Sequence, residues 1–345
     1  MIDPKRLKGI AIALTGVLVA FATLNAALTV AVGPASRWLH HGENPTDWLV
    51  YDDVGGKLSA VARNGQAGTA RPIGILLGQS TLNGIDPEEL TRAVPDGPRW
   101  LNLSGVGGSI NRIKDLSDLV EFSGTRPAEV VLGINPYMLA GTPYEATLDF
   151  QRRRSSTFRL KQAVWTWQNK DNVNHLFRQV LYQARMGLFR STGHGADALF
   201  PPARDPWVLP RQHVANRRLK PDELKERLDY NAGLGWYDPA RYAATNSNSE
   251  SLDALIRGWL ARGAKVRVVL LPESSDQRAR MPAKARRLLE SIVRDASGPE
   301  PVPIVDLGDT QPDDAFLDLD HLNPRGNAGT LALIAAALRG DPPRP

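Results

Sequence analysis

The chain has 345 residues, of which 42% are hydrophobic and 23% are charged. This composition is typical of globular proteins and excludes a fibrous or wholly disordered chain. The absence of cysteine excludes disulfide scaffolds, thiolate metal sites and cysteine nucleophiles. The 42 Lys and Arg residues exceed the 37 Asp and Glu residues by a formal charge of only +5, so we expect no nucleic-acid partner.

Residues 9–33 predict a membrane anchor, because no charged side chain occurs among them. As an α-helix this segment would span roughly 37 Å, which exceeds the roughly 30 Å of a bilayer core. Lys5, Arg6 and Lys8 precede it, and the positive-inside rule then keeps the N-terminus cytoplasmic. We therefore expect residues 1–36 to form a cytoplasmic stub and a single transmembrane helix. The rest of the chain is expected to be extracytoplasmic, in the periplasm or at the cell surface.

A cleaved signal peptide is the alternative interpretation of this N-terminus. The apolar segment is long for a signal peptide, and Pro34 directly follows its best small-residue cleavage site, Ala31-Val32-Gly33. We therefore favour an uncleaved anchor.

Beyond a connecting segment at residues 37–70, short apolar runs alternate with amphipathic stretches. The apolar runs predict buried strands at Ile73–Leu77, Trp100–Leu103, Glu129–Ile134, Val266–Leu271 and Val302–Leu307. Helices are expected from the cap at Asp86-Pro87, over Ile110–Phe122, Leu252–Ala261 and Ala283–Asp295, and from the cap at Asn323-Pro324 to about Leu338.

Continuous apolar strands separated by helices are typical of a parallel sheet that helices cover on both faces. We therefore expect an α/β fold with a five-stranded parallel sheet for residues 71–340. Residues 137–250 interrupt the alternation and are too many for a loop, so they predict a helical insertion. Ligands of such sheets bind at the carboxyl ends of the strands, which makes the residues just after each strand candidates for a site.

Three residues in these positions fit the chemistry of acyl transfer. Ser80 follows the first predicted strand, and Asp318 and His321 lie past the fifth. A serine hydroxyl becomes an effective nucleophile when a histidine takes its proton, and the histidine needs a carboxylate on its other ring nitrogen. We expect Ser80 to attack, His321 to act as base and then acid, and Asp318 to orient the ring. Asp320 is an alternative carboxylate, but a side chain adjacent to His321 is expected to diverge from the ring.

The same pattern predicts an oxyanion hole for the tetrahedral intermediate. Its donors are expected to be the backbone N–H groups of Ser80 and Gly107 and the side-chain amide of Asn135, at the ends of the first three strands. The alternatives are structural, with Ser80 and Gly107 as turn residues, His321 as a loop histidine and Asn135 as a cap.

No metal and no cofactor is expected. The remaining histidines lack metal-ligand spacing. The glycines after the second strand do not form a dinucleotide-binding loop, since Ile110 stands where its third glycine would fall.

The order of these blocks resembles the SGNH/GDSL hydrolase superfamily. That family places Ser, Gly, Asn and His in four short blocks, with an Asp-x-x-His near the C-terminus, and the matching residues here are Ser80, Gly107, Asn135 and the Asp318/His321 pair. Two departures are visible, since Gln79 replaces the acid of the Gly-Asp-Ser block and Pro136 follows the asparagine. Gly105 or Gly108 is an alternative to Gly107 as the glycine of the second block. The resemblance covers residues 71–340 apart from the insertion, and it implies a flavodoxin-like three-layer sandwich.

A narrower resemblance comes from the anchor, the outside-facing domain, the insertion and the ending Asp-His-Leu-Asn-Pro-x-Gly. Together these features are similar to the anchored partners of membrane-bound O-acyltransferases, among them alginate O-acetylation proteins and the D-alanyl transfer protein of teichoic acid modification. The resemblance implies an O-acyltransferase that acetylates an envelope or exported polysaccharide and works with a multi-pass membrane partner. An esterase or deacetylase with the same triad is the first alternative, and a non-catalytic glycan-binding or assembly partner is the second.

Overall fold

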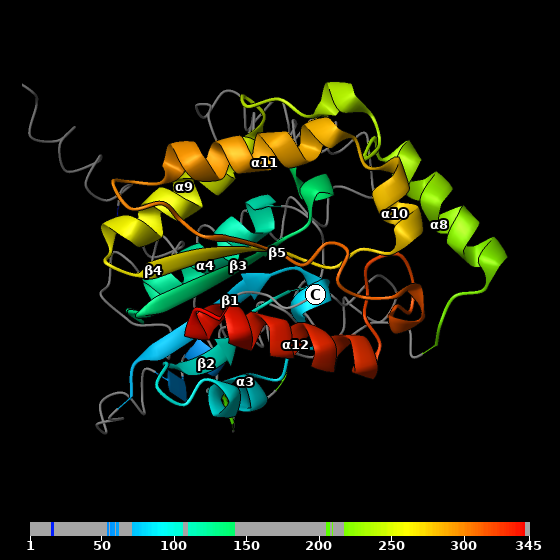
Figure 1. Cartoon of the computed structure of the whole chain (residues 1–345). Coiled ribbons are helices and arrows are strands. Elements are labelled where there is room, and N and C mark those ends of the chain that lie inside the picture. Colours follow the sequence, from blue (N-terminus) through cyan, green and yellow to red (C-terminus); the bar gives the residue numbers. More distant parts are fainter. Residues whose placement is uncertain are drawn as a thin grey trace, which may run out of the picture.

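A computed structural model describes residues 71–105, 110–141 and 217–341, together with positions 15–16, 54, 56–58, 60–61, 205–207 and 209. Its centre is one sheet of five strands in the order β2-β1-β3-β4-β5, and every neighbouring pair is parallel (Figure 1). This is the strand order of flavodoxin-like doubly wound sheets. The strands are β1 (Ile73–Gly78), β2 (Arg99–Asn102), β3 (Glu129–Ile134), β4 (Lys265–Leu270) and β5 (Ile304–Asp306).

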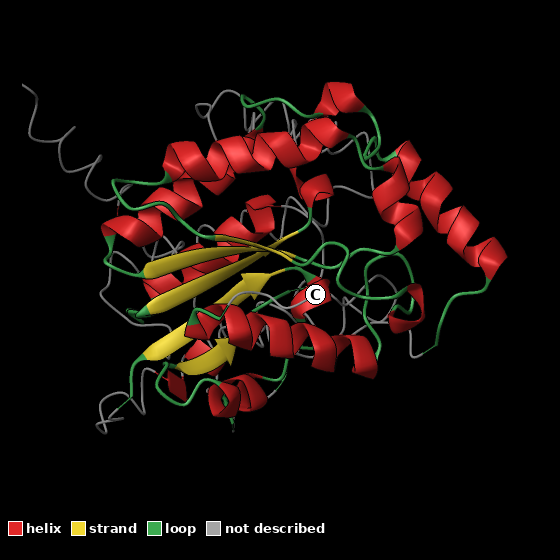
Figure 2. Ribbon diagram, in the orientation of Figure 1, coloured by secondary structure: helices red, strands yellow, loops and turns green. Residues whose placement is uncertain are grey.

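Helices cover both faces of the sheet (Figure 2). One face packs against α4 (Ile110–Phe122), α9 (Ser247–Ala261) and α11 (Ala283–Ala296), and the other against α3 (Pro87–Ala93) and α12 (Pro324–Arg339). Two further helices, α8 (Pro221–Gly233) and α10 (Ser275–Arg280), lie beyond the carboxyl edge of the sheet (Figure 1). The predicted α/β fold with a five-stranded parallel sheet is therefore confirmed.

The burial pattern of the strands explains why a sheet of this kind forms. Side chains of a strand point alternately to the two faces. In β1, Ile75 and Leu77 join the core beneath α4 and α9, while Leu76 joins the core beneath α3 and α12. β3 divides in the same way, with Val131 on the second face. Both faces are buried, so an unbroken apolar run is what the fold requires.

Local signals in the sequence set most helix boundaries. Asp86 caps α3 by accepting hydrogen bonds from the N–H groups of Glu88 and Glu89, and Asn323 caps α12 by accepting one from the N–H of Gly326. Proline occupies the first turn of both helices, where no N–H is needed. These starts agree with the predicted ones.

Three elements differ from the prediction. α9 begins at Ser247 rather than Leu252, because Asn246 caps a polar first turn that carries no apolar period. β5 pairs over three residues only, shorter than the predicted run. α10, capped by Ser274, is too short to produce a periodic signal in the sequence.

Parts of the predicted organisation lie outside the described residues. Among the described helices none is long and apolar enough to cross a membrane, and the predicted anchor at 9–33 is described only at Thr15 and Gly16. Most of the segment 37–70 is likewise outside, although Val54, Leu58 and Val61 are buried in the core beneath α4. Within the predicted insertion at 137–250, α8 is described, while residues 142–204 lie outside the described residues.

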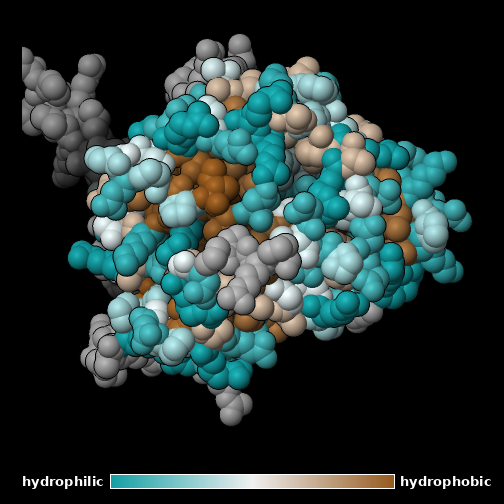
Figure 3. Space-filling model, viewed as in Figure 1, coloured by the Kyte–Doolittle hydropathy of each residue, from teal (hydrophilic) through white to brown (hydrophobic). Residues whose placement is uncertain are grey.

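Hydrophilic residues cover most of the face shown in Figure 3. Hydrophobic residues reach this surface beside the edge strand β5, where Ile304 is 36% exposed.

The close approach of β1 and β3 leads to a first prediction. A methyl group on Gly78 would lie 2.9 Å from the carbonyl oxygen of Gly133 and 2.6 Å from Cδ1 of Leu82. Because the carbonyl cannot swing aside like a side chain, we expect Gly78→Ala to lower the free energy of unfolding by about 1–3 kcal/mol in urea denaturation. Gly298→Ala, with no heavy atom within 4 Å of its new methyl group, is the control and should change it by less than about 1 kcal/mol. Equal stabilities of the two variants would contradict this packing.

Candidate active site

The candidate site lies where the parallel strands end. Ser80 begins a short turn, η1 (Ser80–Leu82), two residues after β1, and Asn135 precedes another, η2 (Pro136–Leu139), directly after β3. The loop that carries Asp318, Asp320 and His321 comes before α12 and crosses the same edge (Figure 1). The predicted convergence of Ser80, Asp318 and His321 is thus present in the fold.

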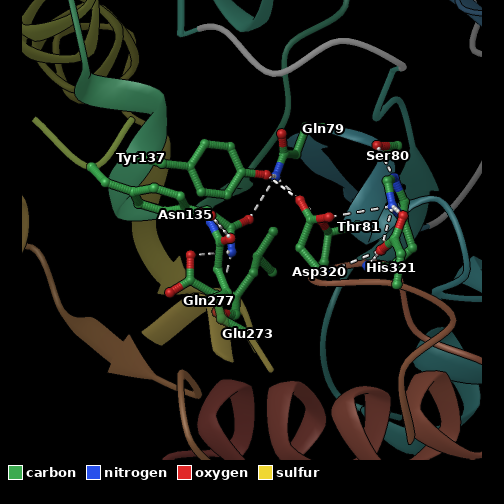
Figure 4. Close-up of polar contacts among 12 residues, drawn as sticks. Gln79, Ser80, Thr81, Asn135, Tyr137, Glu273, Gln277, Asp320 and His321 are labelled. Atoms are coloured by element: carbon green, nitrogen blue, oxygen red, sulfur yellow. Dashed lines mark hydrogen bonds and ion pairs between the residues drawn. The ribbon is translucent and has the colours of Figure 1, made fainter. Parts of the chain in front are cut away.

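Ser80, His321 and Asp318 form a hydrogen-bonded chain. Ser80 Oγ lies 2.7 Å from His321 Nε2, and Nδ1 of the same ring lies 2.7 Å from Asp318 Oδ2 (Figure 4). In the neutral ring that donates its Nδ1 proton to Asp318, the lone pair of Nε2 faces the serine hydroxyl. Both distances fall in the range of about 2.6–3.2 Å that proton transfer between a nucleophile and its base requires.

The loop of the histidine is folded by its own aspartate. Asp318 Oδ1 accepts hydrogen bonds from the backbone N–H groups of Asp320 at 3.1 Å and His321 at 2.8 Å. The backbone N–H of Leu317 donates to the His321 carbonyl at 2.7 Å and closes the turn. Asp318 therefore fixes the backbone of His321 as well as its ring.

The turn that carries Ser80 is held by the neighbouring strand. Asn102, at the end of β2, donates from its side-chain amide to the carbonyls of Leu82 at 2.8 Å and Ile85 at 2.9 Å. These carbonyls belong to the turn that starts at Ser80 and to the residues after it. The position of the hydroxyl therefore depends on the pairing of β1 with β2.

Asp320 also faces the histidine, so the expectation that its side chain diverges from the ring is wrong. Its Oδ1 lies 3.3 Å from His321 Nδ1, and its Oδ2 accepts a short hydrogen bond from the hydroxyl of Tyr137. The tight turn around Asp318 directs the side chain of Asp320 towards the His321 ring. His321 thus meets two carboxylates.

These carboxylates determine the charge of the histidine. Burial by itself would lower the pKa of His321, but the negative charge of Asp320 and the hydrogen bond to Asp318 raise it to about 9. Burial by itself would raise the pKa of Asp318, but its hydrogen bonds to His321 hold it at about 2. At neutral pH the ring therefore carries a proton, and the form that can act as a base grows as the pH rises towards 9.

The structure brings Asn135 to the same edge but gives its amide other partners. Asn135 is fully buried, its Oδ1 accepts a hydrogen bond from Gln79 Nε2 at 2.7 Å, and its Nδ2 donates to Glu273 Oε1 at 3.2 Å. In this arrangement the amide joins the ends of β3 and β4 and does not donate towards Ser80. Gly107, the second expected donor, lies outside the described residues. The Ser80 N–H is at the start of a helical turn, where N–H groups lack partners within the turn.

Glu273 is a buried acid that the sequence analysis did not single out. It follows β4 by a few residues, is 4% exposed and accepts the Asn135 hydrogen bond. Burial raises its pKa to about 8, against the lowering effect of Asn135. The rule applied to the other strands, that residues after a strand end are candidates, would have identified it.

A cavity of about 440 Å³ adjoins Ser80 and His321. Thr81, Asp86, Glu89 and Asn327 supply polar groups to its wall, and Leu317, Leu322 and Leu331 are among its apolar residues. The volume falls within the 300–1,000 Å³ range of ligand pockets. It is far larger than an acetyl group and offers room for a sugar residue.

Asp318, Asp320 and His321 are also the one group in the described part of the chain whose donor atoms lie close enough to share a metal ion, within 4.8 Å of one another. Both ring nitrogens are already engaged, Nδ1 with Asp318 and Nε2 with Ser80. A metal would need one of these lone pairs, so the group fits a hydrogen-bonded triad better than a metal site.

In sequence comparisons the chain matches no family model and no curated protein. The site is therefore interpreted from its own geometry.

The buried acid leads to a second prediction. Between pH 4.5 and about 8 the folded protein holds a proton on Glu273 that an ordinary glutamate in the unfolded chain has lost, so this group makes stability fall as pH rises through that window. Glu273→Gln removes the effect, and its advantage over the wild type in free energy of unfolding should grow from pH 4.5 to 8. Urea denaturation at several pH values measures it. Glu300→Gln, at an exposed loop position, controls for the lost charge, and an advantage that stays constant with pH would contradict a neutral Glu273.

Proposed function

We propose that this protein is a serine acyl-transfer enzyme in which Ser80, His321 and Asp318 form the catalytic triad. The observation that carries the proposal is the pair of hydrogen bonds at 2.7 Å that join the serine hydroxyl to the ring and the ring to the carboxylate. The cavity beside the hydroxyl supports it, because a substrate can reach the nucleophile from there.

The first half of the reaction loads the serine. Ser80 Oγ attacks the carbonyl carbon of an acyl donor while His321 Nε2 takes the hydroxyl proton, and Asp318 stabilises the imidazolium that forms. The tetrahedral intermediate collapses when the bond to the leaving oxygen breaks and His321 returns the proton to that oxygen. The product is an acyl ester on Ser80, and the donor leaves as an alcohol.

In the second half a hydroxyl of the acceptor gives its proton to His321 and attacks the ester carbon. The bond to Ser80 Oγ breaks, the serine recovers the proton, and the acyl group ends on the acceptor. We propose that the acceptor is a polysaccharide hydroxyl and the group acetyl, since the cavity is large enough for a sugar residue. With water in place of the glycan the same steps describe an esterase or deacetylase.

The setting of this activity is also part of the proposal. Residues 9–33 would anchor the chain in a membrane and leave the catalytic domain outside the cytoplasm. A multi-pass membrane-bound O-acyltransferase would supply the acyl group, as in the systems that the sequence resembles. A non-catalytic glycan-binding role is the remaining alternative, and the triad geometry argues against it.

The triad leads to a third prediction, tested with the full chain and a chromogenic acetyl ester. We expect Ser80→Ala to lower kcat by on the order of 10³-fold or more, since the nucleophile is lost. A serine-directed phosphonate should label Ser80 in the wild type, as located by mass spectrometry. Ser291→Ala, on α11 away from the sheet edge, is the matched control. Equal rates for Ser80→Ala and the wild type would remove the triad proposal.

The wild-type rate should also depend on pH with a defined sign. Only the neutral ring of His321 can accept the proton of Ser80, so kcat/KM is expected to rise with pH up to about 9.

The cavity leads to a fourth prediction, which separates transfer from hydrolysis. Ala328 lines the cavity from an exposed position of α12, and Ala332 lies one turn further along the same helix, exposed and outside the cavity wall. If the cavity holds the glycan, Ala328→Trp should lower acetyl transfer to an oligosaccharide by about tenfold or more and spare hydrolysis of a small acetyl ester. Ala332→Trp should change neither rate. Loss of both reactions to the same extent in Ala328→Trp would place the acyl donor in the cavity instead.

A further inference from the structure

A Ser-His-Asp triad needs one carboxylate on its histidine, yet His321 has two. Asp318 accepts the Nδ1 proton at 2.7 Å, and Asp320 Oδ1 lies at 3.3 Å from the same nitrogen. Asp320 is only 8% exposed, and a buried carboxylate without a partner takes up a proton rather than remain charged. The contacts that hold Asp320 in place therefore influence the protonation of the His321 ring.

Besides the His321 ring, Asp320 has a second partner, Tyr137. The Tyr137 hydroxyl donates to Asp320 Oδ2 and in turn accepts a hydrogen bond from Gln79 Nε2, and both are short contacts (Figure 4). Gln79 is the neighbour of Ser80, and Asp320 is the neighbour of His321. A buried chain of hydrogen bonds thus runs from the residue beside the nucleophile to the residue beside the base.

The hydroxyl of Tyr137 is held in position because the Tyr137 ring packs against Trp236. The ring stacks on Trp236 with centroids 4.1 Å apart and planes inclined by 12°. The Trp236 carbonyl accepts a hydrogen bond from the hydroxyl of Tyr242 at 2.5 Å. Burial raises the pKa of Tyr137 well above its usual range, so its hydroxyl stays protonated and remains a donor.

We propose that Tyr137 is a positioning residue that keeps Asp320 ionised and in contact with His321, so that two carboxylates rather than one set the proton affinity of the ring. The proposal deepens the proposed function, because the ring is taken to be the catalytic base. The physical reason is that a hydrogen bond donated to a carboxylate stabilises its charged form. Burial already raises the pKa of Asp320, and loss of the hydroxyl would raise it further, so His321 would lose its proton at a lower pH.

Other charged groups around His321 and Asp320 could also change the pH at which His321 titrates. His321 faces Asp318 and Asp320 from its own loop and Arg227 from α8, which opposes protonation of the ring. Asp320 faces the same groups and Tyr137, while Glu273 and Tyr237 lie further along the buried cluster. Removal of one hydroxyl from Tyr137 deletes none of these charged side chains, so a moved titration reports the contact between Tyr137 and Asp320.

The test is a direct titration of the His321 ring by NMR of the full chain with labelled histidine, the signal being assigned by its loss in His321→Gln. Tyr137→Phe keeps the ring on Trp236 and deletes the hydroxyl. We expect it to lower the pH at which His321 titrates by about one unit or more. Asp320→Asn should lower it in the same direction, and the double variant should shift no further than Asp320→Asn alone.

Tyr242→Phe is the matched control, because it deletes a buried hydroxyl that supports Trp236 without touching Asp320. It should leave the titration of His321 where it is in the wild type. An unmoved titration in Tyr137→Phe, or an equal shift in Tyr242→Phe, would overturn the proposal. If Tyr137→Phe does not fold, Asp320→Asn decides alone, and an unmoved titration in that variant overturns it.

The rate of ester cleavage separates this proposal from the proposed function. If Tyr137→Phe moves the titration but the wild type cleaves esters no faster than Ser80→Ala, the positioning role stands and the enzymatic function fails. If cleavage depends on Ser80 and the titration does not move, the function stands and the positioning role fails. If both hold, the rising limb of kcat/KM should shift to lower pH in Tyr137→Phe by the same amount as the ring.

Discussion

Parallel pairing of β1 with β3 and of β3 with β4 obliges three strands to end at one edge of the sheet. Polar side chains from distant parts of the sequence meet at this edge, because they lie in the loops that follow the strands and not within the strands. The helices on both faces bury the apolar side chains of these strands, so the register of the pairing and the geometry of the edge are fixed together. Ser80 and His321 meet at this edge, with Oγ and Nε2 2.7 Å apart.

The polar groups at the edge are unusually well buried for a surface loop region. Gln79, Asn135, Glu273 and Asp320 are each less than a tenth exposed, and each has a hydrogen-bond partner in the cluster. Burial of such groups costs free energy unless they are paired, and a paired network rigidifies its surroundings. Clusters of shifted pKa values of this kind are typical of functional sites, although structural networks also produce them.

The sequence was sufficient for much of this architecture. Unbroken apolar runs identified the strands because both faces of the sheet are buried, and Asp86 and Asn323 identified helix starts because caps are local. The Ser80, His321 and Asp318 contacts followed from the rule that parallel strands share an edge. The polar first turn of α9 was missed because its burial comes from tertiary packing rather than from composition.

The site was harder to predict wherever contacts depend on side-chain direction. Adjacency to His321 predicts that the Asp320 side chain points away from the ring. The turn around Asp318 instead directs this side chain towards the ring. Asn135 was expected to face the nucleophile, but a buried acid across the edge takes its amide. The contact between Asn135 and Glu273 has no fixed spacing in the sequence that would predict it, because the two residues follow different strands.

The stacking of Trp236 on Tyr137 has an evolutionary consequence. Trp236 belongs to the stretch that separates the third strand from the fourth, where chains of this architecture can accept additional residues without disturbing the sheet. Substitutions in that stretch can reach the His321 ring through the stacking of Trp236 on Tyr137, and also through Arg227 on α8. Under the proposed function, descendants of one ancestor can therefore adapt to more acidic or more alkaline surroundings while Ser80, His321 and Asp318 stay the same.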